Sequence, residues 1–203
     1  MIKLYEKIPK ELLNNLPIKN FEGDIFFIDN IAAVEKTIPE LQKSEILGFD
    51  TETRPAFKKG IAYKVSLLQL ATADKAFLFK IKKTGLPDKL IQILSDKNII
   101  KAGVAIHDDI KALRKIRNFT PEGFTELQTF SDNFGIKDNG LKKLAGNILG
   151  FRISKSARLT DWSKDAYTEA QLKYAATDAW TSYKIYKKLT ELNGNYKIIK
   201  NET

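Results

Sequence analysis

The sequence predicts an α/β domain with a mixed central β-sheet flanked by helices. Apolar runs of strand length are concentrated between residues 46 and 104, and helical patterns follow them to residue 190. Two of these runs, 65–71 and 76–81, are joined by a short polar segment of hairpin length. The order of elements indicates a mixed sheet: strands come first, strands and helices then alternate, and helices follow.

The N-terminal half is expected to supply the edge and the centre of this sheet. Residues 1–20 predict a short helical or irregular lead-in, and residues 26–29 predict a short edge strand. Apolar residues at helical spacing predict a helix at 31–43, and the apolar run at 46–52 predicts the first central strand. The side chains expected to pack inward are Leu12, Leu13, Leu16 and Ile18 of the lead-in and Ile31, Val34, Ile38 and Leu41 of the helix.

The C-terminal half is expected to be mostly helical. A helix at 87–94 leads to a strand at 99–104, and the polar residues 192–203 are expected to fray. We therefore divide the chain into a lead-in packed on the main domain (1–24), a main domain (25–190) and a polar tail (191–203). The further helices are expected at 107–117, 124–134, 140–148 and 168–190.

Composition limits the classes of function. The 203 residues are 43% hydrophobic, enough to bury a substantial core in one domain. The chain has no Cys, which excludes disulfides and thiolate metal sites. It contains neither a long apolar run nor a basic-then-apolar leader, so we expect a cytoplasmic protein without a membrane span. The formal charge of +9 favours polyanionic partners such as nucleic acid.

Asp50 and Glu52 end the apolar run that starts at Ile46. Residues two apart on a strand share one face, roughly 6–7 Å apart. Two like charges that close are costly to bury unless a cation lies between them, and oxygen ligands suit Mg²⁺ or Mn²⁺. The alternative is a strand that ends at the surface with both acids solvated, and an Asp-x-Glu pattern alone does not exclude it.

A third carboxylate is expected at the start of the helix at 107–117. At roughly 100° per residue, Ile106, Ile110 and Leu113 form its inward stripe, and Asp109 lies about 65° from the centre of that stripe. Asp108 points nearly the opposite way and suits the positive end of the helix dipole. Asp109 is therefore the acid that can face the strand ends.

Tyr174 and Asp178 are four residues apart in the long C-terminal helix, so both project from one face. Ile185 and Leu189 lie near the same strip of the helix. Protein is therefore expected to cover the lower end of that strip, and Asp178 at its upper end would face a pocket. A Tyr four residues before an Asp is common by chance, so this pair counts only with the other carboxylates.

In chain order, these segments resemble the three exonuclease motifs of the DEDDy family. They are Phe49-Asp50-Thr51-Glu52-Thr53, Gly103-Val104-Ala105-Ile106-His107-Asp108-Asp109 and Tyr174-Ala175-Ala176-Thr177-Asp178-Ala179. The family comprises 3′-5′ exonucleases of the RNase D and Werner-type group, built on a ribonuclease H-like fold. The resemblance covers roughly residues 25–190 and is nearer to the Werner type. It extends to Lys64–Leu70, Leu141–Leu144 and Asp161–Ser163.

The resemblance implies a metal-dependent enzyme that hydrolyses phosphodiester bonds from the 3′ end and releases nucleoside 5′-monophosphates. Two Mg²⁺ or Mn²⁺ ions would be held about 3.5–4 Å apart. Asp50 would bridge both ions, Glu52 and Asp178 would complete the first site, and Asp109 would serve the second. Because four acids in one cavity repel each other, at least one carboxyl pKa should be raised without metal.

The resemblance also assigns the residue that orients the attacking water. Relatives use either a His five residues before the final Asp or a Tyr four residues before it. Here Lys173 occupies the first position, so Tyr174 is the candidate. The single His of the chain, His107, is expected to be a packed or surface residue rather than a ligand.

Basic residues and one tryptophan are expected to contact the nucleic acid. Arg152, Lys155 and Arg158 precede Trp162 in a loop near the motifs, and Lys64 follows the acidic strand. Basic groups would contact phosphates, whereas Trp162 would either stack on a base or simply pack. DNA and RNA both remain open as substrates.

Two features depart from the family. Relatives often carry an Asp in a Glu-Leu-x-Asp segment, where this chain has Glu126-Leu127-Gln128-Thr129. That position is not one of the four metal ligands. No helicase and no helical nucleic-acid-binding domain accompanies the fold, so processivity or targeting would need a protein partner or a homo-oligomer. The competing interpretations are a non-catalytic nucleic-acid or protein-binding module that keeps the fold and, less favoured by the basic charge, a hydrolase of small nucleotides.

Overall fold

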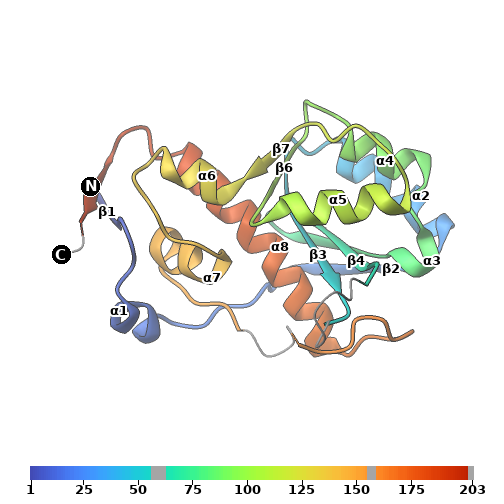
Figure 1. Ribbon diagram of the computed structural model, residues 1–203, viewed down its shortest axis with the longest axis horizontal. Helices are drawn as coiled ribbons and strands as arrows, with labels where there is room; N and C mark the ends of the chain where they lie inside the picture. The colour runs from blue at the N-terminus through green and yellow to red at the C-terminus, as the bar shows by residue number, and fades with distance from the viewer. Residues whose placement is uncertain (56–62, 155–158, 201–203) are drawn as a thin grey trace.

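The computed structural model describes residues 1–55, 63–154 and 159–200. It has one six-stranded sheet and one separate strand pair (Figure 1). The strands are β1 (Ile2–Tyr5), β2 (Asp24–Ile28), β3 (Ile46–Thr53), β4 (Val65–Ala71), β5 (Lys75–Lys80), β6 (Ile100–Gly103), β7 (Phe124–Glu126) and β8 (Tyr196–Ile199). The helices are α1 (Lys10–Asn15), α2 (Ile31–Gln42), α3 (Ile81–Thr84), α4 (Asp88–Leu94), α5 (Ile106–Ile116), α6 (Leu127–Asp132), α7 (Leu141–Leu144) with a π-helical turn (Ala145–Leu149), and α8 (Glu169–Thr190).

The main sheet is mixed, as the sequence predicts. Its strand order is β2-β5-β4-β3-β6-β7. The antiparallel pairs β3–β4 and β4–β5 form a meander, and β2, β6 and β7 join by parallel pairing. The expected β4–β5 hairpin and the expected edge position of β2 are both confirmed.

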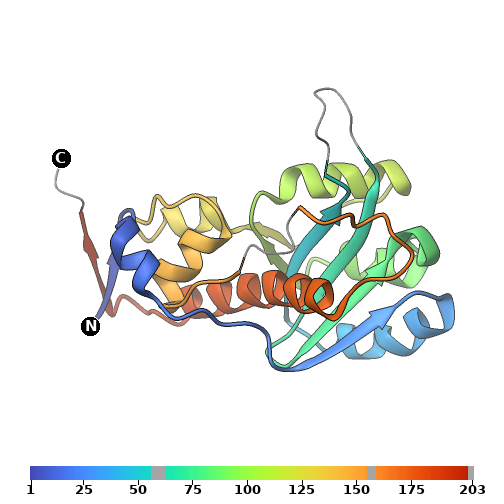
Figure 2. The same ribbon diagram turned by 90° about the horizontal axis from the view of Figure 1, so that it is seen from below.

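Helices cover both faces of this sheet (Figures 1 and 2). On one face, α2, α4 and α5 pack against apolar side chains of β3, β4 and β5, among them Leu47 and Phe49. On the other face, α8 lies across the sheet and contacts β3 more than any other strand. Because successive residues of a strand face opposite sides of the sheet, Gly48, Asp50 and Glu52 of β3 face α8 rather than the side of Leu47 and Phe49. The acidic end of β3 therefore lies beneath α8.

The chain termini differ from the prediction. Residues 196–199 form β8 and pair in parallel with β1, so this part of the tail is not frayed. Leu4 of β1 is buried in a cluster with Ile185 and Leu189, which explains why the two ends are held at the C-terminal part of α8. In the lead-in, Leu13 is buried as expected, whereas Leu12 and Ile18 are 37% and 57% exposed.

Three further expectations need correction. The first three residues of the segment 124–134 form β7, because they pair with β6. A strand of three residues is too short to show an alternating pattern in the sequence. The segment 140–148 is divided between α7 and the π-helical turn. Ile31 is 48% exposed, because it is the first residue of α2, directly after the N-cap Asn30. The short helix α3 was not expected.

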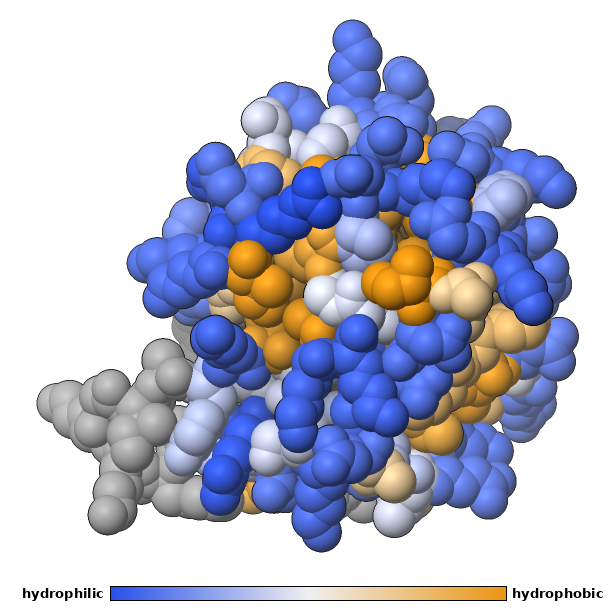
Figure 3. Space-filling view, turned by 90° about the vertical axis from the view of Figure 1, so that its right-hand side faces the viewer, coloured by the Kyte–Doolittle hydropathy of each residue, from blue (hydrophilic) through white to orange (hydrophobic). Residues whose placement is uncertain are grey.

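One end of the molecule carries α2, α3 and α4. Figure 3 shows that hydrophilic side chains cover most of this face and surround a smaller group of apolar ones in a hollow. No helix among the described residues combines the length and the apolar character that a membrane span requires.

Candidate active site

Three carboxylates meet where β3 ends beneath α8. Asp50 and Glu52 come from β3, and Asp178 comes from α8. One carboxylate oxygen of each lies within 4.8 Å of the others. Asp50 and Glu52 are half-buried, and Asp178 is 6% exposed. Three oxygen donors so close together suit a hard divalent cation such as Mg²⁺ or Mn²⁺.

The carboxyl group of Asp50 lies among other negative charges. Burial raises the pKa of Asp50 well above its usual range, and the neighbouring carboxylates of Asp178, Glu52 and Asp109 raise it further. The backbone N–H of Thr51, which donates to Asp50 at 2.9 Å, opposes this rise. The expected raised carboxyl pKa is thus confirmed. A group of carboxylates that repel one another in this way could hold a cation.

Tyr174 lies one helical turn before Asp178 and lines the same cavity. Burial raises the pKa of its hydroxyl far above the usual value, and the negative charges of Asp178 and Glu52 and a hydrogen bond to Asp178 act in the same direction. The phenol therefore stays protonated at neutral pH. A protonated phenol can take part in hydrogen bonds but is not a free phenolate base.

Asp109 lies beside the three carboxylates but is not in their group. Its carboxylate accepts a hydrogen bond from the hydroxyl of Thr51, whose side chain points from β3 to the α5 face. Burial raises the pKa of Asp109 to about 6, with smaller contributions from Asp108 and Glu126. The structure therefore gives three convergent acids and a fourth on the other side of β3. Asp108 and His107 are exposed.

Glu126 positions the helix that carries Asp109, and sequence reasoning missed this role. Its carboxylate accepts the backbone N–H groups of Ala105 at 3.0 Å and Ile106 at 2.9 Å. The helix itself offers no acceptor to these N–H groups, because they lie at the start of α5. Ala105 precedes α5 in a left-handed conformation (φ 59°). The position of Glu126 at the end of β7 is a signal that it could cap α5, the helix that follows β6. The pairing of β6 with β7 that brings them together was not predicted.

The three carboxylates and Tyr174 open into a cavity of about 630 Å³. Residues of α1 and α7 also line it, namely Lys10, Asn14, Lys142 and Lys143. The cavity thus has both acidic and basic lining residues. Sequence reasoning did not place the lead-in at the site.

Hydrogen bonds to buried polar groups hold the lead-in in this position. Asn147 of the π-helical turn accepts the backbone N–H of Tyr5 at 2.8 Å and donates to its carbonyl at 2.7 Å. The carboxylate of Asp138 accepts the N–H of Ile8 at 2.9 Å and a hydrogen bond from Asn147 at 2.8 Å. The lead-in is therefore fixed to the body of the protein.

The residues expected to contact nucleic acid are dispersed. Lys64 is exposed and lines a second pocket. Arg152 donates to the carbonyl of Leu16 at 2.9 Å and so holds the lead-in. Trp162 is fully buried, which favours packing among the two roles left open for it. Lys155 and Arg158 lie outside the described residues.

Residues 25–192 match a family model described as 3′-5′ exonuclease. The chain belongs to the 3′-5′ exonuclease family. This confirms the resemblance to DEDDy-type exonucleases that the three motifs indicate. The family membership explains why acids from β3 and α8 converge, since these two elements carry the first and third of those motifs.

Relatives of known name agree with this assignment. The chain is 33% identical over 201 residues to the mouse bifunctional 3′-5′ exonuclease/ATP-dependent helicase WRN, covering 92% of this chain and 14% of that protein. It is 28% identical to ribonuclease D of a Shewanella species, covering 90% of this chain and 45% of that one. It thus spans less than half of both relatives.

Solved structures show the same fold. The EXO domain of Aedes aegypti Nibbler covers 86% of this chain with a TM-score of 0.75 at 23% identity, and 94% of that domain is matched. Escherichia coli RNase D covers 82% of this chain, and 44% of that chain is matched, with a TM-score of 0.74 at 23% identity. The mixed sheet flanked by helices is therefore the expected ribonuclease H-like fold.

Proposed function

We propose that this protein is a metal-dependent 3′-5′ exonuclease that hydrolyses nucleic acid from its 3′ end and releases nucleoside 5′-monophosphates. The observation that carries the proposal is the convergence of Asp50, Glu52 and Asp178 within 4.8 Å, with the Tyr174 hydroxyl in the same cavity. The family match supports the same reaction class. A binding module would have no use for a set of acids that repel each other.

Two Mg²⁺ or Mn²⁺ ions fit the donor set. Asp50, Glu52 and Asp178 would hold the first, while Asp50 and, through water, Asp109 would hold the second. When bound, the ions would lower the pKa of the attacking water and stabilise charge on the leaving 3′ oxygen. In the metal-free protein the Asp109 carboxylate accepts a hydrogen bond from the Thr51 hydroxyl, so serving the second ion would require this carboxylate to turn toward Asp50.

Tyr174 would orient the attacking water. Its hydroxyl remains protonated and is held by Asp178, so it can direct a water molecule without giving up its own proton. The same acid would therefore serve as metal ligand and as the partner that aligns the tyrosine.

The substrate would be a nucleic acid strand that lies in the cavity lined by these acidic and basic residues. Lys10, Lys142 and Lys143 would contact its phosphates. The formal charge of +9 would draw a polyanion to the protein. A Trypanosoma brucei RNase D has been solved with RNA U12, which makes a single RNA strand one substrate to test, together with DNA of matched sequence.

The test is to incubate the protein with 5′-labelled and 3′-labelled oligonucleotides of DNA and RNA, with Mg²⁺ or Mn²⁺. The expected result is a ladder from the 5′-labelled strand and a labelled mononucleotide from the 3′-labelled strand. EDTA and Asp50→Ala should abolish both. Asp108→Asn is the matched control, because Asp108 is exposed and outside the group of acids. Tight binding without shortening of any strand would instead support the non-catalytic module.

A further inference from the structure

A second pocket lies beside the candidate active site, at the same edge of the sheet. Its volume is about 420 Å³, near the lower end of the range for sites that hold small ligands, roughly 300–1,000 Å³. Arg54 at its rim is two residues after Glu52. The buried ring of Trp162 lines it and lies 6.1 Å from the ring of Tyr174, centroid to centroid. One indole therefore separates the two cavities.

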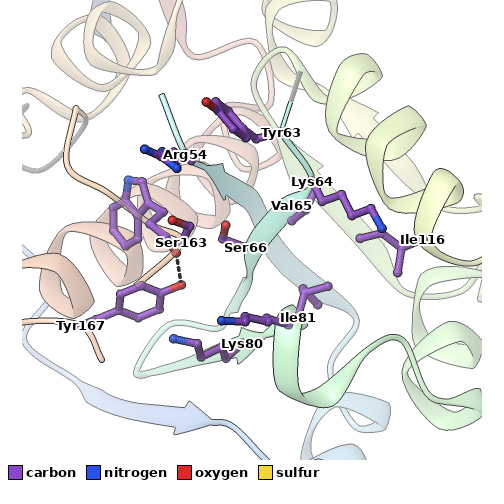
Figure 4. A pocket seen from close by; sticks show the side chains of 12 residues that line it. Arg54, Tyr63, Lys64, Val65, Ser66, Lys80, Ile81, Ile116, Ser163 and Tyr167 are labelled. Carbon is purple, nitrogen blue, oxygen red and sulfur yellow. Dashed lines mark hydrogen bonds between the residues drawn. The ribbon is translucent and has the colours of Figure 1, made fainter. Parts of the chain in front are cut away.

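The interior of the pocket is apolar and aromatic. Val65 and Ile81 are buried and Ile116 is half-buried. The rings of Tyr63 and Tyr167 lie on opposite sides of it, with the Ser66 hydroxyl between them (Figure 4). Tyr63 is 38% exposed, so its ring is open to a ligand. Such a lining suits a flat, partly apolar group, and nucleobases stack on aromatic side chains.

The inner wall holds its shape through one buried cation. The ammonium of Lys80, only 1% exposed as a residue, donates to the carbonyl of Asp165 at 2.6 Å and to that of Lys164. It also lies 4.4 Å from the centre of the Tyr167 ring. The Tyr167 hydroxyl donates to the carbonyl of Trp162 at 2.6 Å, which fixes the ring. The aromatic wall is therefore preformed.

The rim of the pocket is positively charged. Arg54 lies over the Tyr63 ring at 5.2 Å and is 4.0 Å from the Asp161 carboxylate, with half of its side chain exposed. Lys64 is exposed and forms no ion pair with any residue that the structure describes. An aromatic interior with a cationic rim matches a base and its attached phosphate.

We propose that this pocket binds one unpaired nucleotide of the substrate strand, with its base between Tyr63 and Tyr167 and its phosphate at Lys64 and Arg54. The assignment rests on the proposed function for the nature of the strand. It adds a second contact point next to the carboxylates, and it makes an unpaired strand the preferred ligand, because a paired base cannot enter a pocket of this size.

The experiment measures binding of single-stranded oligonucleotides of two to eight nucleotides by fluorescence anisotropy, in EDTA. Wild-type protein should show a step in affinity once the strand is long enough to reach the pocket. Tyr63→Ala and Lys64→Ala should each remove most of that step, roughly tenfold, while affinity for the dinucleotide stays the same. Tyr63→Phe and Lys64→Arg should retain it.

Lys97→Ala is the control, since Lys97 is exposed and precedes β6 at the opposite end of the sheet. Equal affinity of wild type and both alanine variants for the longer strands would overturn the proposal. The variants change exposed residues, and their melting curves should match that of the wild type. Because EDTA prevents hydrolysis, this assay measures binding alone. A protein that shows the step in affinity but cleaves no strand with Mg²⁺ or Mn²⁺ would support the nucleotide pocket and contradict the proposed exonuclease function.

Discussion

A methyl group built on Gly48 of β3 would lie 1.8 Å from the carbonyl oxygen of Ala179 on α8. The two backbones are therefore closer than any side chain permits. Gly48 is two residues before Asp50, and Ala179 directly follows Asp178. This contact sets the separation between the two elements that carry the acids.

Gly48→Ala should consequently separate the carboxylates as well as weaken the packing. Overpacking of this kind costs typically about 1–3 kcal/mol. We expect Mn²⁺ affinity and nuclease activity to fall by more than the lower stability alone would explain. Calorimetry measures the affinity, and oligonucleotide cleavage measures the activity. Gly194→Ala is the matched control. It is strained by its φ of 76° but has open space around it, far from the acids. A Gly48→Ala variant with normal metal affinity would contradict this account.

Tyr174→Phe tests the water-positioning role. Only the hydroxyl is removed, so metal and oligonucleotide binding should remain, while turnover should fall about 100-fold or more. Because the pKa of this hydroxyl is far above the usual value, no alkaline limb from its ionisation should appear in the wild-type rate profile. Tyr196→Phe is the control, because it removes a phenolic hydroxyl on β8, in the separate strand pair with β1, and should keep the turnover number. Unchanged turnover in Tyr174→Phe would assign the water to another group.

The parts of the site that the sequence predicts are those determined by local geometry. Asp50 and Glu52 share a face because strand residues alternate, and Tyr174 and Asp178 share one because helix residues recur every turn. The mixed sheet and the hairpin of β4 and β5 could be predicted from apolar runs and one short polar connection. These statements need no knowledge of distant residues.

The missed parts depend on contacts between distant segments. Glu126 reaches Ala105 only because β7 pairs with β6, and β7 is too short to show a pattern. Lys10 reaches the cavity only because the two ends of the chain pair as β1 and β8 and Asn147 fixes Tyr5. The bonding of Asp109 to Thr51 depends on how α5 sits above β3, which helical periodicity alone does not specify.

Glu126→Ala should displace the start of α5. The variant leaves the N–H groups of Ala105 and Ile106 without their acceptor, at a cost of about 1–3 kcal/mol. Since Asp109 lies in the first turn of that helix, the nuclease activity should fall by more than the smaller folded fraction of the variant alone would explain. Glu126→Gln retains an acceptor and should recover most of the stability. Chemical denaturation and cleavage assays on both variants measure the two effects. Wild-type activity in Glu126→Ala would show that Asp109 does not depend on this cap.

The Asp109 carboxyl group should make the metal-free protein less stable as the pH rises from about 4 to 6. Asp109 has its pKa raised from 3.8 to about 6 in the folded protein. Between these values the folded state holds more protons than the unfolded state, so deprotonation favours unfolding. The full effect is about 3 kcal/mol. Denaturation in EDTA across this range should show the slope, and Asp109→Asn should reduce it. The exposed Asp132→Asn should not. The Asp50 carboxyl acts in the same direction, so part of the slope should persist.

The basic lining residues should govern substrate affinity rather than turnover. Lys10 is exposed on α1 and lines the same cavity as the carboxylates. Lys10→Ala should raise KM about 3- to 10-fold with little change in kcat, because a phosphate contact made equally in bound substrate and transition state contributes only to binding. It should also reduce the dependence of binding on salt by about one counterion. Lys97→Ala, distant from the cavity, should change neither quantity. A fall in kcat at constant KM would mean that Lys10 acts on the reacting phosphate itself. An unchanged salt dependence would mean that the strand passes the cavity without touching α1.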